Sequence, residues 1–274
     1  MSKFKEMRDE FPTLIDRAYE TMKKFHLVED IMSKDVAIVG PDANMAEAAK
    51  TMGEKHIGSL VVMVEKKLSG IVTERDLLSK ILALGKDPAK VKVKEVMSSP
   101  VISVKPSLTI KEAARTMIEK KGRLVVLADG CVVGVITASD LIKSLPEGPE
   151  TELKVDKVMT KHITSVSETV SVAEAAKTMG DQRIGSVIVN RKGNPFGIFT
   201  ERDLLTTFLA KGKSLQSKVG DAVSHPIVTI PTGTSVHKTA AMMSARHIRR
   251  LPVVEKNKII GIVTARDLVE AYAK

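Results

Sequence analysis

The sequence Gly-Ile-Val-Thr-Glu-Arg-Asp-Leu at Gly70–Leu77 recurs three more times, with few changes, along the 274-residue chain. The other copies are Gly-Val-Ile-Thr-Ala-Ser-Asp-Leu at Gly134–Leu141, Gly-Ile-Phe-Thr-Glu-Arg-Asp-Leu at Gly197–Leu204 and Gly-Ile-Val-Thr-Ala-Arg-Asp-Leu at Gly261–Leu268. The aspartates of these copies are 64, 63 and 64 residues apart. Such a fixed period indicates four structural repeats.

A longer period pairs the repeats. Ala46–Gly53 and Ala173–Gly180 are identical, and the offset of 127 residues between them also relates Gly70 to Gly197. We therefore expect two modules of two repeats each, at 28–145 (repeats 1 and 2, 28–88 and 89–145) and 153–274 (repeats 3 and 4, 153–213 and 214–274). The stretch 143–153, which is rich in proline and glutamate, is expected to link them. Apolar residues from Phe11 to Phe25 predict an N-terminal helix over 1–27.

Each repeat has the same predicted order of elements. A short apolar strand comes first, then a helix with alanines and a methionine at helical spacing, two further strands and a closing helix. The expected first strands are 36–39, 101–104, 163–166 and 227–230. Glu65-Lys66 and Asp129-Gly130 are expected to form tight turns between the later strands. The fold class is therefore α/β, with small sheets covered by helices.

Composition narrows the class of protein. Aromatic residues make up 3% of the chain, so the core is aliphatic, with 13 methionines filling gaps. No apolar run approaches the roughly 20 residues of a membrane span, and no secretory signal is recognised. The single cysteine, Cys131, fits a reducing cytoplasm. The net charge of +10 favours anionic partners, among them nucleotides and nucleic acid.

Motifs for catalysis or metal binding are absent from the sequence. The six histidines form no His-x-x-x-His pair, and neither a Gly-x-Ser-x-Gly elbow nor a Walker-type phosphate loop occurs. An enzyme usually has one asymmetric site, whereas the distinctive residues here recur four times. We therefore expect a binding module, not an enzyme, with no metal and no catalytic cofactor.

The recurring Thr-x-x-Asp unit has two interpretations. A threonine at a helix N-cap with an acid three residues later forms a capping box, a purely structural role. A carboxylate in this place can also accept hydrogen bonds from the two hydroxyls of a ribose. The two roles are compatible, and the sequence leaves both open.

The repeats resemble the cystathionine-beta-synthase (CBS) domain. Besides the Gly-h-h-Thr-x-x-Asp motif, where h is apolar, three repeats open with Ile31-Met32-Ser33, Val96-Met97-Ser98 and Val158-Met159-Thr160. The fourth departs from this pattern as Ala222-Val223-Ser224. The resemblance covers roughly 28–272 and implies two Bateman modules, similar to the regulatory gamma subunit of AMP-activated protein kinase. It also implies an adenine ligand: AMP, ADP or ATP, and less commonly S-adenosylmethionine or NAD.

The resemblance implies roles for particular residues. The motif aspartates would bind ribose and the motif threonines ribose or phosphate: Asp76, Asp140, Asp203 and Asp267 with Thr73, Thr137, Thr200 and Thr264. The opening segments of the four repeats would pass close to the base: Ser33–Ala37, Ser98–Ile102, Thr160–Thr164 and Ser224–Val228.

Phosphate groups need cations, and the repeats differ in them. In this family a position eleven residues before the motif glycine often holds a basic residue. It is occupied by Arg250, preceded by Arg249, in repeat 4 and by Arg123 in repeat 2, but by uncharged residues in repeats 1 and 3. Arg75, Arg202 and Arg266 stand beside motif aspartates, where they serve either a phosphate or a neighbouring acid. From this distribution we expect the module at 153–274 to bind nucleotide more tightly.

The resulting expectation is a non-catalytic regulatory protein that senses adenine nucleotides. A ligand would change the module arrangement, and a separate protein target would read the change. A homodimer is compatible with this reading. Two other classes stay open: a basic nucleic-acid-binding regulator, and a structural assembly module with empty clefts.

Overall fold

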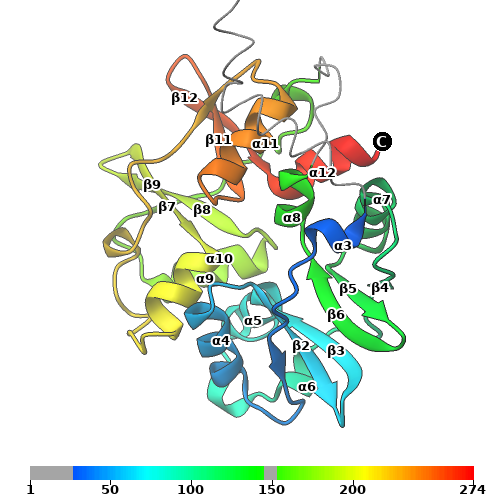
Figure 1. Ribbon diagram of the computed structural model, residues 1–274. Helices are drawn as coiled ribbons and strands as arrows, with labels where there is room; N and C mark the ends of the chain where they lie inside the picture. The colour runs from blue at the N-terminus through cyan, green and yellow to red at the C-terminus, as the bar shows by residue number, and fades with distance from the viewer. Residues whose placement is uncertain (1–26, 145–152) are drawn as a thin grey trace, which may run out of the picture. The chain divides into compact units, whose positions relative to one another are not determined.

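The computed structural model describes residues 27–144 and 153–274. The predicted N-terminal helix and linker fall largely on 1–26 and 145–152, outside the described residues. Within the described part, every repeat has a three-stranded sheet, a helix after the first strand and a closing helix after the third (Figure 1). The predicted α/β class is confirmed.

Repeats 1 and 3 have matching elements. Those of repeat 1 are β1 (Ile38–Val39), α4 (Met45–Glu54), β2 (Ser59–Val64), β3 (Lys67–Thr73), α5 (Glu74–Lys80), η1 (Leu82–Leu84) and η2 (Pro88–Lys90). Those of repeat 3 are η3 (Val155–Lys157), β7 (Ser165–Ser167), α9 (Val172–Asp181), β8 (Ser186–Arg191), β9 (Asn194–Thr200), α10 (Glu201–Asp203) and η4 (Leu204–Leu209). Each closing helix begins directly after the motif threonine, as the sequence predicts.

Repeats 2 and 4 follow the same order. Those of repeat 2 are α6 (Val93–Val96), β4 (Ser103–Val104), α7 (Ile110–Lys120), β5 (Leu124–Ala128), β6 (Cys131–Ile136) and α8 (Ala138–Lys143). Those of repeat 4 are η5 (Val219–Asp221), β10 (Ile230–Pro231), α11 (Val236–Ala245), β11 (Arg250–Glu255), β12 (Lys258–Thr264) and α12 (Ala265–Ala273). One further short helix, α3 (Val28–Ile31), opens repeat 1.

The four sheets share one topology. The first strand pairs in parallel with the second, and the second and third strands form an antiparallel hairpin. Both residues of the Glu65-Lys66 turn have positive φ, and so do those of Asp129-Gly130, as expected for tight two-residue hairpin turns. The first strands are two or three residues long, shorter than predicted, because the chain before them pairs with a different sheet, as described below.

The chain forms two compact units that do not follow sequence order. Unit 1 takes its described residues from Met1–Lys34, Ile102–Lys161 and Ile230–Lys274, and so holds most of repeats 2 and 4. Unit 2 comprises Asp35–Val101 and His162–Thr229, most of repeats 1 and 3. The predicted modules 28–145 and 153–274 group the repeats by sequence and stay a prediction.

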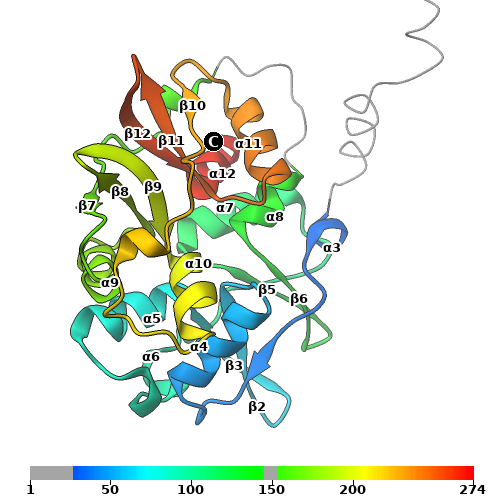
Figure 2. The ribbon, with the colours of Figure 1, turned by 90° about the vertical axis from the view of Figure 1, so that its left-hand side faces the viewer.

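In unit 2, repeats 1 and 3 are held together by close helix contacts and by two leucines, each of which packs in the core of the other repeat. Leu205, from η4, belongs to the core of repeat 1, and Leu78, from α5, belongs to the core of repeat 3. Gly53 and Gly180 permit the close approach, since a Cβ on Gly53 would lie 2.6 Å from Cβ of Ala210, and one on Gly180 2.4 Å from Cβ of Ala83. These two glycines end the identical stretches found in the sequence. Figure 2 shows α4, α5, α9 and α10 gathered at this contact.

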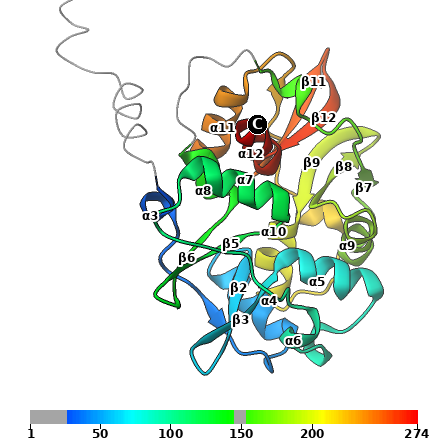
Figure 3. The same ribbon diagram turned by 90° about the vertical axis from the view of Figure 1, so that its right-hand side faces the viewer.

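Unit 1 is also held together by helices. Helix α12 contacts α7 and α8, and α11 contacts α8 and α12 (Figure 3). The side chain of Arg115 on α7 donates a hydrogen bond of 3.1 Å from Nε to the carbonyl of Ala273 on α12. The positions equivalent to Gly53 and Gly180 are Ile118 and Ser244, so unit 1 has no glycine at either position.

Candidate functional site

The motif threonine and aspartate form the same capping box in all four repeats. The threonine amide donates to Oδ2 of the aspartate at 2.7–2.9 Å, and the threonine hydroxyl donates to the same oxygen at 2.6–2.7 Å. The structural interpretation of Thr-x-x-Asp is therefore confirmed. Because the cap uses Oδ2, the second oxygen, Oδ1, decides what else each aspartate can do.

The second oxygen distinguishes the two units. In unit 2, Oδ1 of Asp76 forms an ion pair of 2.7 Å with Nζ of Lys80, and Oδ1 of Asp203 accepts a hydrogen bond of 3.1 Å from the hydroxyl of Ser224. In unit 1, Oδ1 of Asp140 and Oδ1 of Asp267 have no hydrogen bond or ion pair within residues 27–144 and 153–274. The carboxylates of unit 1 therefore keep an acceptor that can serve a ligand.

Each opening segment pairs with the sheet of the other repeat in its predicted module. Backbone amide and carbonyl groups are exchanged in four isolated bridges: Ser33 with Val135, Ser98 with Ile71, Thr160 with Ile262 and Ser224 with Ile198. Further along the same segments, the carbonyls of Ala37, Ile102 and Thr164 accept from the second strand of their own repeat. Each segment thus contributes to two repeats in turn, which the sequence did not indicate. Val228 belongs to unit 2, and not to the unit that carries Asp267.

The pairing of each opening segment with the sheet of another repeat explains why the motif begins with glycine. A Cβ on Gly70, Gly134 or Gly261 would lie 2.4–2.6 Å from Sδ of the methionine of an opening segment, respectively Met97, Met32 and Met159. Real Cβ atoms essentially never come this close, so a larger residue at this position of the third strand would force the methionine or the strand to shift. In the remaining case Val223 replaces methionine, and its Cγ2 would be 2.7 Å from a Cβ on Gly197. The deviating fourth segment therefore packs as the others do.

The strand register places the basic positions beside the motif threonines. Arg250 pairs directly with Thr264, and Arg123 stands one residue before the pair of Leu124 with Ile136, hence opposite Thr137. Opposed side chains of an antiparallel pair lie on one face with Cβ atoms about 5 Å apart. In unit 2 the same positions hold serine, with Ser59 opposite Thr73 and Ser186 opposite Thr200.

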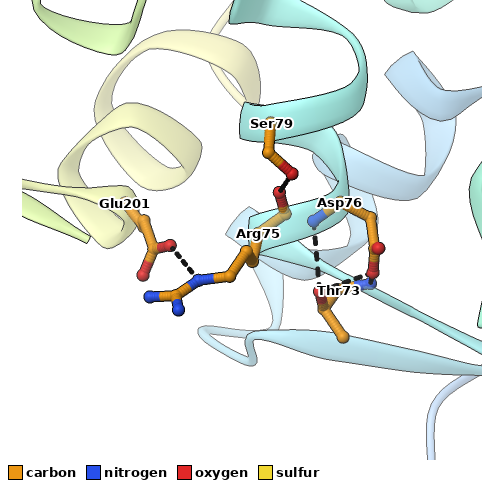
Figure 4. Close-up of polar contacts among 5 residues, drawn as sticks. All are labelled: Thr73, Arg75, Asp76, Ser79 and Glu201. Atoms are coloured by element: carbon orange, nitrogen blue, oxygen red, sulfur yellow. Dashed lines mark hydrogen bonds and ion pairs between the residues drawn. The ribbon is translucent and has the colours of Figure 1, made fainter. Parts of the chain in front are cut away.

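The acid that follows the threonine in repeats 1 and 3 is buried. The side chain of Glu201 is 3% exposed, and its Oε1 lies 3.4 Å from Nε of Arg75 (Figure 4). Figure 4 also shows that Arg75 extends away from the Thr73–Asp76 cap. Arg202 and Glu74, at the equivalent positions, also have interaction partners. In repeats 2 and 4 the position of these acids is held by Ala138 and Ala265.

Burial shifts the ionisation of three motif aspartates. It raises the pKa of Asp140, Asp203 and Asp267 above the ordinary value of 3.8, although hydrogen bonds from the neighbouring threonine act in the opposite direction. For Asp203 the hydroxyl of Ser224 also lowers the pKa. Such shifts mark carboxylates whose charge lacks full compensation, a frequent property of binding sites.

The structure thus brings most predicted site residues together, each within one unit. Unit 2 contains Thr73, Asp76, Ala37 and Ser98 together with the equivalent Thr200, Asp203, Thr164 and Ser224. Unit 1 contains Thr137, Asp140, Arg123 and Ser33 together with Thr264, Asp267, Arg249, Arg250, Arg266 and Thr160. Sequence reasoning missed Lys80, which contacts the carboxylate of Asp76. Its spacing of four residues from Asp76, the usual spacing of helical ion pairs, was the available signal.

The described residues contain neither a metal-ligand cluster nor a membrane-spanning helix. Within them no three side chains of histidine, cysteine, aspartate or glutamate come together as a metal site. No helix in residues 27–144 or 153–274 has both the length and the apolarity to cross a membrane.

Comparisons with known proteins agree with this geometry. Protein MJ1404 of Methanocaldococcus jannaschii, which is uncharacterized, is 28% identical over 266 residues, and the match covers 90% of this chain and 62% of MJ1404. The uncharacterized protein MK0525 of Methanopyrus kandleri is 37% identical over 121 residues, which cover 43% of this chain and 62% of MK0525. This chain thus spans less than two thirds of the length of these relatives.

Solved structures share the fold. The crystal structure of Protein MJ1225 from Methanocaldococcus jannaschii, described as a candidate archaeal homologue of g-AMPK, superposes with a TM-score of 0.75 at 23% identity, covering 90% of this chain and 99% of MJ1225. An uncharacterized conserved protein from Pyrococcus horikoshii superposes with a TM-score of 0.62 at 22% identity, with the same coverage. The family model "CBS domain" matches residues 28–83, 93–147, 155–210 and 219–274. Four such matches account for most of the sequence, so the chain belongs to the CBS-domain family and carries four CBS domains in tandem.

Proposed function

We propose that this chain is a non-catalytic regulatory protein that binds AMP, ADP or ATP through Thr-x-x-Asp sites and signals to a separate protein target. The observation that carries the proposal is the half-buried carboxylate of Asp267, whose Oδ2 is held by Thr264 while Oδ1 has no hydrogen bond within residues 27–144 and 153–274. A buried carboxylate gains when its acceptors are satisfied, and the vicinal hydroxyls of a ribose are donors of suitable spacing.

The position of the opening segments supports a response to ligand. Thr160 exchanges backbone hydrogen bonds with Ile262, two residues before Thr264. A ligand at Asp267 would therefore contact both the closing helix of repeat 4 and the chain that leads into repeat 3. Binding that favours one arrangement of such a segment shifts the population of states, which a partner can read.

The test is calorimetric titration of the whole chain with AMP, ADP and ATP. Asp267→Asn removes the charge but keeps an oxygen for the cap, and we expect it to weaken nucleotide binding by about tenfold or more at its site. The matched control is Glu112→Gln, because Thr109 and Glu112 form a capping box of the same geometry away from the motif, with a 2.6 Å hydrogen bond from the hydroxyl. Nucleotide binding should be unchanged in the control. Equal losses in both variants, or no binding to the wild-type chain, would overturn the proposal.

A further inference from the structure

We propose that phosphorylated nucleotides bind at Asp140 and Asp267, in unit 1, in preference to Asp76 and Asp203, in unit 2. This inference rests on the proposed function and adds which sites bind the phosphorylated ligand and which residues select it. Three differences between the units carry it: the charge opposite the motif threonine, the residue that follows that threonine, and the partner of Oδ1.

The first difference is a cation in place of a hydroxyl. Arg250 pairs with Thr264, and Arg123 is opposite Thr137 in the same register, so each arginine shares a sheet face with the threonine that caps the site. Arg123 and Arg250 are half-buried, which limits the competition from water, and both already have interaction partners that a phosphate would join or replace. Arginine binds phosphate through paired charge-assisted hydrogen bonds. Ser59 and Ser186 carry no charge at the equivalent places in unit 2.

The second difference is an acid in unit 2 where unit 1 has alanine. Glu74 and Glu201 are 5% and 3% exposed, and each directly follows a motif threonine. The ion pair with Glu201 holds the side chain of Arg75 away from the Thr73–Asp76 cap (Figure 4). A phosphate beside Thr73 would have to compete with the carboxylate of Glu201 for Arg75, which is unfavourable. Ala138 and Ala265 present no such charge in unit 1.

The third difference is the second carboxylate oxygen. Lys80 contacts Oδ1 of Asp76, and Ser224 donates to Oδ1 of Asp203, so a ribose hydroxyl in unit 2 must displace an existing partner. In unit 1, Oδ1 of Asp140 and of Asp267 makes no such contact among the described residues. A ligand gains more where it satisfies an acceptor than where it exchanges one partner for another.

All three differences distinguish unit 1 from unit 2, and none of them distinguishes the first half of the sequence from the second. The expectation drawn from the sequence groups Asp203 with Asp267, because both belong to 153–274. The structure instead groups Asp140 with Asp267. Double variants that change two motif aspartates at a time distinguish the grouping by sequence from the grouping by unit.

The experiment titrates ATP and adenosine into the whole chain. We expect D140N/D267N to weaken ATP binding by about tenfold or more, and D76N/D203N to weaken it much less. R123S/R250S installs the serine that repeats 1 and 3 carry at these positions, so the sheets should fold. It should weaken ATP by about tenfold or more while adenosine affinity stays close to that of the wild type. K111Q, which removes an exposed charge from α7, is the control for net charge and should bind both ligands normally.

The outcomes separate this inference from the proposed function. Equal ATP loss in D140N/D267N and D76N/D203N overturns the assignment to unit 1, as does a larger loss in D203N/D267N than in D140N/D267N. Wild-type ATP affinity in R123S/R250S overturns the role of the arginines, while the proposed function stands. A wild-type chain that binds neither ATP nor adenosine contradicts the proposed function itself. Unfolding midpoints of all variants establish that each is folded during the titration.

Discussion

The hydroxyl of Ser224 donates a hydrogen bond of 3.1 Å to Oδ1 of Asp203. Ser224 belongs to the opening segment of repeat 4 and Asp203 to the closing helix of repeat 3, so the contact joins two consecutive repeats at one carboxylate. The backbone of Ser224 is fixed at the same time by two hydrogen bonds to Ile198. The opening segment of repeat 4 therefore forms part of the site of repeat 3. A substitution in the segment affects the site, and a substitution in the site affects the segment.

Removing this hydroxyl gives a first prediction. Ser224→Ala should lower the free energy of unfolding by about 0.5–1.5 kcal/mol, the usual net value of a hydrogen bond. It should also raise the pKa of Asp203 further, because Ser224 is one of the groups that lower it. Urea unfolding and carboxyl titration by NMR measure the two effects. Ser98→Ala is the matched control, since Ser98 has the same backbone pairing without a side-chain hydrogen bond in the described ranges. Equal behaviour of the two variants would contradict the prediction.

The motif glycine gives a second prediction. Gly70→Ala places a Cβ 2.6 Å from Sδ of Met97 and 3.2 Å from the carbonyl oxygen of Ser98. The methionine can move, but the backbone oxygen belongs to the paired opening segment. We expect a loss of about 1–3 kcal/mol in unfolding free energy, as for other overpacked cores. Gly40→Ala is the control in the same repeat, because no atom lies within 4 Å of its added Cβ. A stable Gly70→Ala chain would argue against the exchanged packing.

The ion pair between Arg75 and Glu201 gives a third prediction. Arg75→Ala leaves the carboxylate of Glu201, 3% exposed, without this cation, and should cost about 1–3 kcal/mol. Glu201→Ala creates the Thr-Ala-Arg-Asp sequence that repeat 4 already has. The double variant should therefore lose less than the sum of the single variants, and a double-mutant cycle of urea denaturation measures the difference. Additive losses would indicate that the two side chains do not interact.

Proton linkage gives a fourth prediction. Burial holds the folded-state pKa of Asp140, Asp203 and Asp267 above the unfolded value near 3.8. These carboxyls thus contribute stability that is fully present below that unfolded value and is lost as pH rises through the raised folded values. D140N/D203N/D267N lacks this loss, so it should gain stability relative to the wild type as pH rises above the unfolded value and through the raised folded pKa values. Urea unfolding over this range measures the difference, and a gain in the opposite direction would contradict the cause assigned to the shifts.

Most of the fold could be predicted from the sequence because it is repeated locally. Thr73 caps α5 through contacts within three residues, and Glu65-Lys66 turns within one hairpin, so short-range chemistry determines both. The first strands were predicted too long, since their apolar pattern cannot show that Ser33 leaves to pair with Val135, about a hundred residues away. Long-range pairing of this kind leaves one signal in the sequence: a motif glycine, such as Gly70, and an opening-segment methionine, such as Met97. That signal can be interpreted only once the contact between the two residues is known.

The candidate site likewise has a part that the sequence predicts and a part that it does not. The pairing of Thr264 with Asp267 is local and follows from the motif. The alternation of Thr-Glu-Arg-Asp with Thr-Ala-x-Asp was visible in the sequence, but its meaning was not, because only the structure groups repeat 1 with repeat 3. Lys80 and Glu201 were overlooked for a related reason: an ordinary charged helix surface offers many such residues, and burial selects the few that matter.

The most direct measurement is the number of ATP molecules bound per chain, determined by equilibrium dialysis on the wild type and on D140N/D267N. Our account predicts two tightly bound ATP molecules in the wild type, at the carboxylates of Asp140 and Asp267. It predicts that the double variant binds both about tenfold or more weakly while the chain stays folded. Absence of ATP binding to the wild type, or undiminished binding to D140N/D267N, would contradict the account.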